Sequence, residues 1–304
     1  MNKQHRHKQS GDQLELEIPT PPEQDRNHQK GGRSFYFFDF DDNVVNMLTT
    51  IVLFHQKSGK ELPITTQQMA KLGNMVGKSG PYQDYQFNYC EQSGSFRHFR
   101  DPLPDERGSK KRSPFLIDLQ EALKLPEHRW KGPSWNFFSY AVTNQRPLSI
   151  ITARGHTPDT IKEGINLLCR HMELPTPNYL AIFPVSHLAT RDRLNSSIHN
   201  APDSASTSEL KRKAIICSVQ QGVETYGNNS YHRFGMSDDD PHNLKLITQA
   251  MVELKRGAYS NMSFFVIDTH QGDCRKTEIL AHHLIKHEIS AELDDDHPLS
   301  LFDT

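Results

Sequence analysis

Several carboxylates follow a run of aromatic residues early in the chain. Phe35 to Phe38 are consecutive aromatic residues, and Asp39, Asp41 and Asp42 come directly after them. A short apolar run bounded by polar residues is typical of a buried strand in a parallel sheet, and open α/β sheets bind ligands at the carboxyl ends of such strands. Because carboxylates this close repel one another, we expect a hard divalent cation among them, although an exposed acidic turn has the same pattern.

A second acidic segment repeats this pattern later in the chain. A short apolar run ends at Met236, and Asp238, Asp239 and Asp240 follow it. Acidic residues also stabilise the N-terminus of a helix, so capping of the helix predicted next would explain them as well. Since parallel strands place their carboxyl ends at one edge of a sheet, the two acidic segments are expected to converge there.

A third strand ends in a hydroxyl group. The apolar run 147–151 leads to Thr152 and then to Arg154, after which Thr157 and Pro158 open a predicted helix. Free backbone N–H groups at a helix start favour an anion, and Thr152 would add a hydroxyl donor. An ordinary strand-to-helix turn would have the same sequence features.

Basic residues open another predicted helix, over residues 209–223. Lys211 and Lys213 lie in its first turns, where positive charge opposes the helix dipole. This placement indicates an anionic partner, although solvated lysines would fit the pattern too.

The order of these segments predicts the fold. Apolar strands alternate with helices, which favours an α/β fold with a Rossmann-like parallel sheet and helices on both faces. A β-hairpin within residues 44–66 is expected to project as a flap, although an ordinary edge hairpin would have the same sequence features. The aromatic segment that follows is expected to form an inserted cap lobe. The predicted parts are a disordered tail (1–32), a core with the flap hairpin (33–66 and 145–285), a cap-like insertion (67–144) and an acidic tail (286–304).

Composition narrows the classes of partner. The 304 residues carry a formal net charge of −2, so no overall positive field favours nucleic acid or a membrane surface. The apolar segments are too short to span a bilayer, and the start of the chain lacks a signal-peptide core. The four cysteines form no CxxC pair, which favours a cytoplasmic setting with free thiols. No pattern indicates an oligomeric state.

Four motifs in this order resemble those of the haloacid dehalogenase-like (HAD) superfamily over about residues 34–268. In this sequence they are Asp39-Phe40-Asp41, Thr152, a lysine that is Lys211 or as second choice Lys213, and the pair Asp238 and Asp239. One departure is Asn43, because the family usually has Thr or Val four positions after its first Asp.

The resemblance implies a Mg²⁺-dependent phosphatase that hydrolyses a small-molecule phosphomonoester through an aspartyl-phosphate. Asp39 would be the nucleophile and Asp41 the general acid and base. Thr152 and the lysine would hold the phosphoryl oxygens. The implied Mg²⁺ ligands are Asp39, the main chain of Asp41, Asp238 and the neighbouring Asp239.

Two other classes of function remain consistent with the same residues. A phosphotransferase or mutase would share the first chemical step and pass the phosphoryl group to an organic acceptor. A non-catalytic protein could use the same pocket to bind a phosphorylated ligand. The aromatic and arginine residues of the predicted cap would suit an anionic or ring-bearing substrate, or would simply pack a small lobe.

Overall fold

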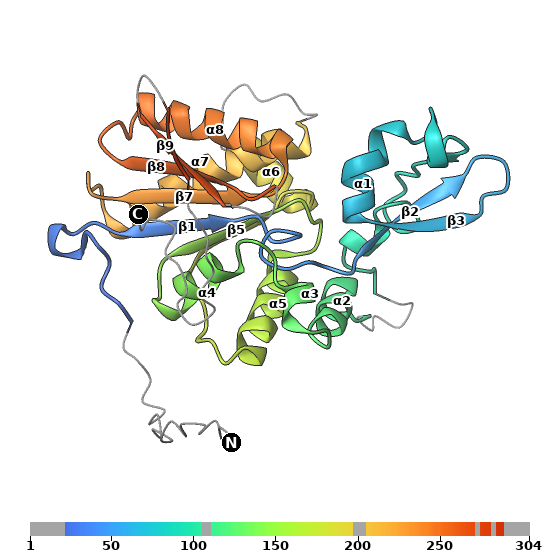
Figure 1. The fold of residues 1–304 in the computed structure, drawn as a ribbon, viewed down its shortest axis with the longest axis horizontal. Helices are drawn as coiled ribbons and strands as arrows, with labels where there is room; N and C mark the ends of the chain where they lie inside the picture. The colour runs from blue at the N-terminus through green and yellow to red at the C-terminus, as the bar shows by residue number, and fades with distance from the viewer. Residues whose placement is uncertain (1–21, 105–110, 197–204, 271–273, 281–283, 289–304) are drawn as a thin grey trace, which may run out of the picture.

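The computed structural model describes residues 22–104, 111–196, 205–270 and 274–280, together with the backbone of residues 284–288. These residues form a mostly parallel sheet with helices on both faces, and a separate three-stranded sheet (Figure 1). The predicted α/β fold with a Rossmann-like parallel sheet is confirmed at this level.

The main sheet has seven strands within the described residues, in the order β10-β9-β8-β7-β1-β5-β6. The strands from β8 to β6 in this order run parallel, and β9 and β10 at one edge are antiparallel. The strands are β1 (Ser34–Phe38), β5 (Leu148–Thr152), β6 (Tyr179–Pro184), β7 (Arg233–Asp238), β8 (Ser263–Asp268), β9 (Arg275–Ile279) and β10 (Leu284–Glu288).

The position of β1 explains the aromatic run. Successive side chains of a strand point to opposite faces of the sheet. Tyr36 and Phe38 join the hydrophobic cluster on one face, and Phe35 and Phe37 join the cluster on the other. All are fully buried because β1 lies between β5 and β7 and both faces are covered. A buried strand of a parallel sheet is therefore apolar throughout instead of alternating.

Helices form a layer on each face of the main sheet (Figure 1). Residues of α2, α3, α4 and α5 pack with Tyr36 and Phe38, while residues of α6, α7 and α8 pack with Phe35 and Phe37. The helices are α2 (Pro114–Ala122), α3 (Glu127–Trp130), α4 (Trp135–Thr143), α5 (Pro158–His171), α6 (Leu188–Ser196), α7 (Thr207–Tyr226) and α8 (Pro241–Arg256).

The order of the strands reverses beside β1. From β1 the chain adds β5 and β6 on one side, and it then crosses to add β7 and β8 on the other side. Such a reversal opens a crevice at the carboxyl ends of the strands, where open α/β sheets bind ligands. Asp39 follows β1 and Asp238 ends β7, so the two acidic segments meet at this crevice.

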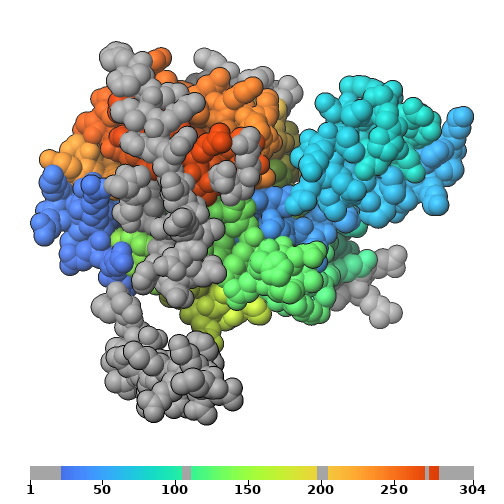
Figure 2. Space-filling model, in the orientation of Figure 1, coloured from blue at the N-terminus to red at the C-terminus, as the bar shows by residue number. Residues whose placement is uncertain are grey.

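Residues 50–100 form a small lobe that stands out to one side of the core (Figures 1 and 2). Its sheet has the order β3-β2-β4, and its interior is centred on Ile51, Leu53, Ile64 and Tyr82. Its elements are β2 (Thr50–His55), β3 (Glu61–Thr65), α1 (Thr66–Leu72), β4 (Tyr85–Gln86) and the short 3-10 helices η2 (Gly73–Met75), η3 (Gly80–Tyr82) and η4 (Arg97–Phe99).

The boundaries between the core and the small lobe differ from the predicted boundaries. The hairpin β2–β3 pairs with β4 and belongs to the small lobe, whereas the prediction placed it with the core in residues 33–66. Helices α2 and α4, which lie within the predicted insertion 67–144, pack against β1 in the core. A hairpin can join any sheet with a free edge, and here the partner strand comes from residues 85–86.

The ends of the chain differ in part from the predicted tails. Residues 22–32, predicted to continue a disordered tail, contact the core through Glu23 and Asp25. The Tyr140 hydroxyl donates to Glu23 Oε2 at 3.0 Å, and the Ser34 N–H donates to Asp25 Oδ2 at 2.6 Å. Residues 286–288 belong to β10, while residues 1–21 and 289–304 lie outside the described residues. Among the described helices, none combines the length and apolarity that crossing a bilayer requires.

Candidate functional site

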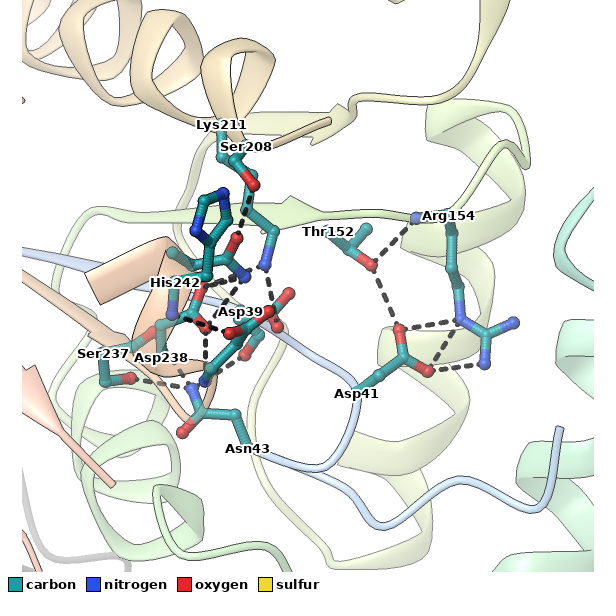
Figure 3. A network of polar contacts seen from close by, with 12 residues as sticks. Asp39, Asp41, Asn43, Thr152, Arg154, Ser208, Lys211, Ser237, Asp238 and His242 are labelled. Carbon is teal, nitrogen blue, oxygen red and sulfur yellow. Dashed lines mark hydrogen bonds and ion pairs between the residues drawn. The ribbon is translucent and has the colours of Figure 1, made fainter. Parts of the chain in front are cut away.

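Lys211 connects the two acidic strand ends. Its Nζ lies 3.0 Å from Asp39 Oδ2 and 2.9 Å from Asp238 Oδ2 (Figure 3). The lysine side chain comes from α7 and is only 2% exposed. Burial alone would lower the pKa of Lys211, but Asp238 and Asp39 together raise it above its ordinary value. Lys211 therefore carries its positive charge between the two carboxylates.

Asp239 adds a third carboxylate to this cluster. Asp39, Asp238 and Asp239 each present an oxygen, and these oxygens lie within 4.8 Å of one another. Burial raises the pKa of Asp39 well above its ordinary value, with Lys211 opposing the shift. Burial, followed by the charge of Asp238, raises the pKa of Asp239 to about 7. One lysine does not balance three carboxyl groups, so burial favours their neutral forms unless a further cation is bound beside them.

This cluster fits the divalent cation expected from the sequence. Mg²⁺ prefers carboxylate and carbonyl oxygens, and the cluster offers three carboxyl groups that Lys211 alone would not balance when all are ionised. The buried Asp39 Oδ1 has no hydrogen-bond partner within the described part of the chain. A buried polar atom without a partner is uncommon in native proteins, and a missing ion is one of its recognised explanations.

Asn43 connects the loop after β1 to the end of β7. Its Nδ2 donates to the Asp39 backbone carbonyl at 3.1 Å and to Ser237 Oγ at 3.0 Å. Its Oδ1 accepts from Ser134 Oγ at 2.7 Å and from Thr269 Oγ1 at 2.8 Å. Asn43 is fully buried, so this amide joins four segments and places Asp39 beside β7. The asparagine at this position therefore has a structural role in this chain.

The start of α8 orients Asp238. Asp238 Oδ1 accepts from the Asp240 backbone N–H at 2.9 Å and from Asn243 Nδ2 at 3.2 Å. Asp240 in turn caps α8 by accepting from the His242 N–H at 2.8 Å. The acidic segment was expected either to cap the following helix or to supply carboxylates to the site. Asp240 caps the helix, while Asp238 faces Lys211.

Asp41 faces a different set of partners. Arg154 Nη2 donates to Asp41 Oδ1 at 2.6 Å, and Arg154 Nε lies 2.9 Å and 3.0 Å from the two carboxylate oxygens. The Thr152 hydroxyl donates to Asp41 Oδ2 at 3.1 Å. Figure 3 shows the Asp41 carboxylate directed toward Arg154 and Thr152, and the Asp39 carboxylate directed toward Lys211.

Both sets of residues border one cavity of about 770 Å³. Asp39, Lys211 and Asp239 line it from the crevice, and Asp41 and Arg154 line it beside them. Burial raises the pKa of Asp42, which also lines this cavity, to about 6. The small lobe contributes Thr66 and Arg100 and a larger apolar part of the wall, which consists of Ile51, Met69, Ala70, Tyr89, Phe96 and Phe99.

The structure places the predicted residues as follows. Asp39, Lys211, Asp238 and Asp239 form one cluster, and Asp41 and Thr152 form a neighbouring pair. Lys213, the second choice for the lysine, is buried elsewhere and donates to Asn195 Oδ1 at 2.8 Å. Of the two lysines, Lys211 is therefore the one in the cluster.

The anion site predicted at the start of α5 is already filled by the chain itself. Asp101 Oδ2 accepts from the Thr157 backbone N–H at 2.8 Å and from Thr160 Oγ1 at 3.0 Å. Thr157 also caps the helix through the Thr160 N–H at 3.2 Å. The carboxylate of Asp101 thus takes the place of the expected ligand anion.

Two residues of the site had no assigned function in the sequence. Arg154 lies two positions after Thr152, close to the carboxyl end of a predicted parallel strand. Polar residues at such strand ends are candidates for a binding site, so its position could have identified it. For Asn43 the sequence shows only a difference from the haloacid dehalogenase-like pattern that it resembles. No local pattern identifies its partners, because Ser134, Ser237 and Thr269 are far away in the sequence.

Comparisons of the chain with protein-family models, with curated proteins and with solved structures find no match.

Proposed function

We propose that this chain is a Mg²⁺-dependent phosphatase of the haloacid dehalogenase-like type, which hydrolyses small-molecule phosphomonoesters through an aspartyl-phosphate on Asp39. The observation that carries the proposal is the buried Lys211 between Asp39 and Asp238 at the crevice of the main sheet. A lysine and several carboxylates at one cavity suit a phosphate and a divalent cation together.

The reaction has two steps. In the first, an Asp39 carboxylate oxygen bonds to phosphorus while the bond to the leaving oxygen breaks, and Asp41 gives that oxygen a proton. In the second, a water molecule attacks phosphorus, Asp41 takes a proton from the water, and the bond between Asp39 and phosphorus breaks. Inorganic phosphate then leaves. Lys211 offsets negative charge on the phosphoryl group in both steps.

The carboxylate cluster would hold the metal. Asp39, Asp238 and Asp239 are its proposed side-chain ligands, and the Asp41 main-chain carbonyl is the fourth. When bound, Mg²⁺ neutralises charge on the phosphate.

Thr152 is proposed to hold a phosphoryl oxygen, as the resemblance implies. Its hydroxyl donates to Asp41 in this structure, so a phosphate oxygen has to compete for the same proton. Thr152 is also fully buried at the end of β5. We therefore assign Lys211 the larger share of phosphate binding.

The small lobe is proposed to act as the cap, with the β2–β3 hairpin as part of it. Its wall of the cavity is largely apolar and partly aromatic, and it also includes Thr66 and Arg100. This chemistry favours a leaving group with an apolar or ring-bearing portion. We propose the cytoplasm as the compartment of this chain, where the four free cysteines would stay reduced.

A phosphatase screen tests the proposal. Aryl phosphates, nucleotides, sugar phosphates and phosphoamino acids are incubated with the protein and Mg²⁺, and released phosphate is measured. We expect release that stops with EDTA and returns with Mg²⁺. Transfer of the phosphoryl group to an organic acceptor, without free phosphate, would instead indicate a phosphotransferase.

The variants for this screen replace aspartates at or just after the carboxyl ends of three strands of the main sheet. Asp39→Asn is expected to abolish phosphate release, and Asp238→Ala to remove it or to raise the Mg²⁺ concentration required. Asp268→Asn is the matched control, because Asp268 ends β8 in register with Asp238 but lies outside the carboxylate cluster. Normal turnover by a folded Asp39→Asn protein would contradict the covalent mechanism. Binding of phosphorylated ligands without any turnover would indicate a non-catalytic binding protein.

A further inference from the structure

Arg154 holds both oxygens of Asp41. The guanidinium contacts Asp41 Oδ1 through Nη2 and Nε, and it contacts Oδ2 through Nε, at 2.6 Å to 3.0 Å. The Thr152 hydroxyl completes the set at Oδ2. A planar guanidinium that contacts both oxygens specifies the plane of the carboxylate, which the point charge of a lysine cannot do.

Arg154 itself has little freedom to move. The side chain is 0% exposed, and its guanidinium carbon lies 4.7 Å from the centroid of the Phe115 ring and 5.0 Å from that of Phe99. Its backbone carbonyl accepts from the Ser186 N–H at 3.1 Å. The orientation of Asp41 is therefore set by a residue that is itself held on several sides.

Arg154 contacts both chain segments that connect the core to the small lobe. In the first connection, Thr49 Oγ1 accepts from Arg154 Nη2 at 2.8 Å, one residue before β2 begins. In the second connection, Phe99 packs against the guanidinium, and its carbonyl accepts from the Gly155 N–H at 2.8 Å. Asp101, two residues further on, accepts from the backbone N–H of Thr157, the N-cap of α5. Arg154 thus lies where the chain leaves the core for the lobe and returns.

We propose that Arg154 is a positioning residue that sets the orientation of the Asp41 carboxylate and couples it to the placement of the small lobe. The inference rests on the proposed function, in which Asp41 transfers the proton to the leaving oxygen. A displacement of the lobe moves Thr49 and Phe99, both of which contact the guanidinium, and so changes the position from which Arg154 holds Asp41. The placement of the Asp41 carboxylate thereby depends on the placement of the lobe.

The choice of substrate separates positioning from simple support of the fold. The kcat/KM value covers binding and phosphoryl transfer from the substrate, and transfer from an alkyl phosphate needs a proton for the leaving oxygen. Transfer from 4-nitrophenyl phosphate does not, because nitrophenolate leaves unprotonated. A positioning residue that acts through Asp41 therefore affects the two substrates unequally, whereas a general loss of folded protein affects them equally.

Arg154→Lys keeps the charge and removes the planar contact. We expect kcat/KM for an alkyl phosphate to fall by about 10- to 100-fold, a part of the total effect of general acid catalysis. For 4-nitrophenyl phosphate we expect kcat/KM to change by less than about threefold. In an Asp41→Asn background, Arg154→Lys is expected to reduce kcat/KM for the alkyl phosphate by no more than about threefold further, because the group that it positions is absent.

Two more variants complete the experiment. Thr49→Val removes only the contact from the first connection, so it is expected to show the same substrate dependence to a smaller extent. Arg97→Lys is the matched control, because Arg97 makes a comparable paired contact with Glu61 within the lobe, at 3.1 Å and 2.8 Å, away from Asp41. It is expected to leave both kcat/KM values unchanged. Circular dichroism and thermal melting confirm that each variant is folded, and Thr49→Val provides the test if Arg154→Lys does not fold.

The outcomes separate this inference from the proposed function. If the unmodified protein releases no phosphate from any substrate, both fail. If it is active but Arg154→Lys and Thr49→Val affect both substrates equally, or the double variant loses activity as if the two sites were independent, only the role of Arg154 is overturned.

Discussion

Lys211 Nζ lies 3.0 Å from Asp39 Oδ2, and the lysine side chain is 2% exposed and the aspartate 10%. The contact joins residues that are far apart in the chain, at the end of β1 and in α7. Removal of one member of a buried ion pair leaves the other charge without compensation. This relationship makes the stability of the protein and the proposed chemistry depend on the same lysine.

The first prediction concerns that lysine. Lys211→Met should lower the free energy of unfolding by about 3–5 kcal/mol in EDTA, because Asp39 and Asp238 then face each other unpaired. Mg²⁺ should restore part of this loss, since a cation at the cluster would replace the missing charge. Urea denaturation with and without Mg²⁺ measures both effects.

Lys213→Met is the matched control for this experiment. Lys213 is equally buried on α7, but its Nζ contacts the neutral side chain of Asn195. We expect a smaller loss of stability, no recovery with Mg²⁺, and phosphatase activity that is retained. Equal effects of the two substitutions on stability and activity would show that Lys211 has no special relation to the cluster.

The second prediction concerns the phospho-enzyme. Asp41→Asn should slow turnover by about 10²- to 10⁴-fold, because general acid and base catalysis is lost. With 4-nitrophenyl phosphate the first step needs no proton, so the phosphoryl group should accumulate on Asp39. Intact-protein mass spectrometry after a short incubation detects the added mass.

The control for this measurement is the double variant with Asp39→Asn, which should gain no mass. Normal steady-state turnover by Asp41→Asn, together with no trapped phosphate, would mean that Asp41 is neither the acid nor the base.

The third prediction concerns Asn43, the residue that departs from the family pattern. Asn43→Thr introduces a threonine, the residue of the pattern that the sequence resembles, at a fully buried position whose amide contacts four segments. We expect the free energy of unfolding to fall by about 2–4 kcal/mol, because several buried partners lose their hydrogen bonds. Urea denaturation measures the change.

Asn46→Thr is a suitable comparison for Asn43→Thr. The Asn46 amide bridges only to backbone carbonyls near α3, including that of Lys131 at 3.0 Å, and it is partly exposed. Asn46→Thr should therefore lower the free energy of unfolding clearly less than Asn43→Thr does. Equal losses at the two positions would argue against a special role of Asn43 in joining β1 to β7.

The fourth prediction concerns a buried histidine near the site. Both ring nitrogens of His156 lack a hydrogen-bond partner within the described residues, and the side chain is fully buried. Burial, followed by the charge of Arg154, lowers the pKa of His156 to about 3, although Asp101 and Asp41 oppose the shift. Below about pH 6.5 the unfolded chain therefore binds a proton that the folded chain does not.

His156 should thus make the protein less stable as the pH falls. Between pH 7 and pH 5 its contribution to the free energy of unfolding should decrease by about 2 kcal/mol. His156→Leu should lack this decrease, so its stability relative to the unmodified protein should rise by that amount at pH 5. The raised pKa values of Asp42 and Asp239 act in the opposite direction, but they are common to both proteins. Denaturation curves at the two pH values measure the difference, and identical pH dependence would contradict it.

Local patterns in the sequence were sufficient for some elements of the core, but not for the antiparallel edge strands β9 and β10. The aromatic run at β1 and the helix start at Thr157 and Pro158 appear in the structure as predicted, because burial on both faces of a sheet and helix capping depend on neighbouring residues. The same patterns placed Asp39 and Asp238 at strand ends. Parallel strands then bring these ends to one edge whatever the sequence between them.

The sequence by itself therefore determined the class of fold and the residue types at the carboxyl edge of the sheet. Only the tertiary structure decided between Lys211 and Lys213, which lie on nearly opposite sides of α7 because two residues of a helix turn through about 200°. It also decided that Arg154 holds Asp41 and that Asn43 joins β1 to β7. These contacts join residues that are distant in the chain, and a side chain acquires such partners only when the packed core brings the segments together.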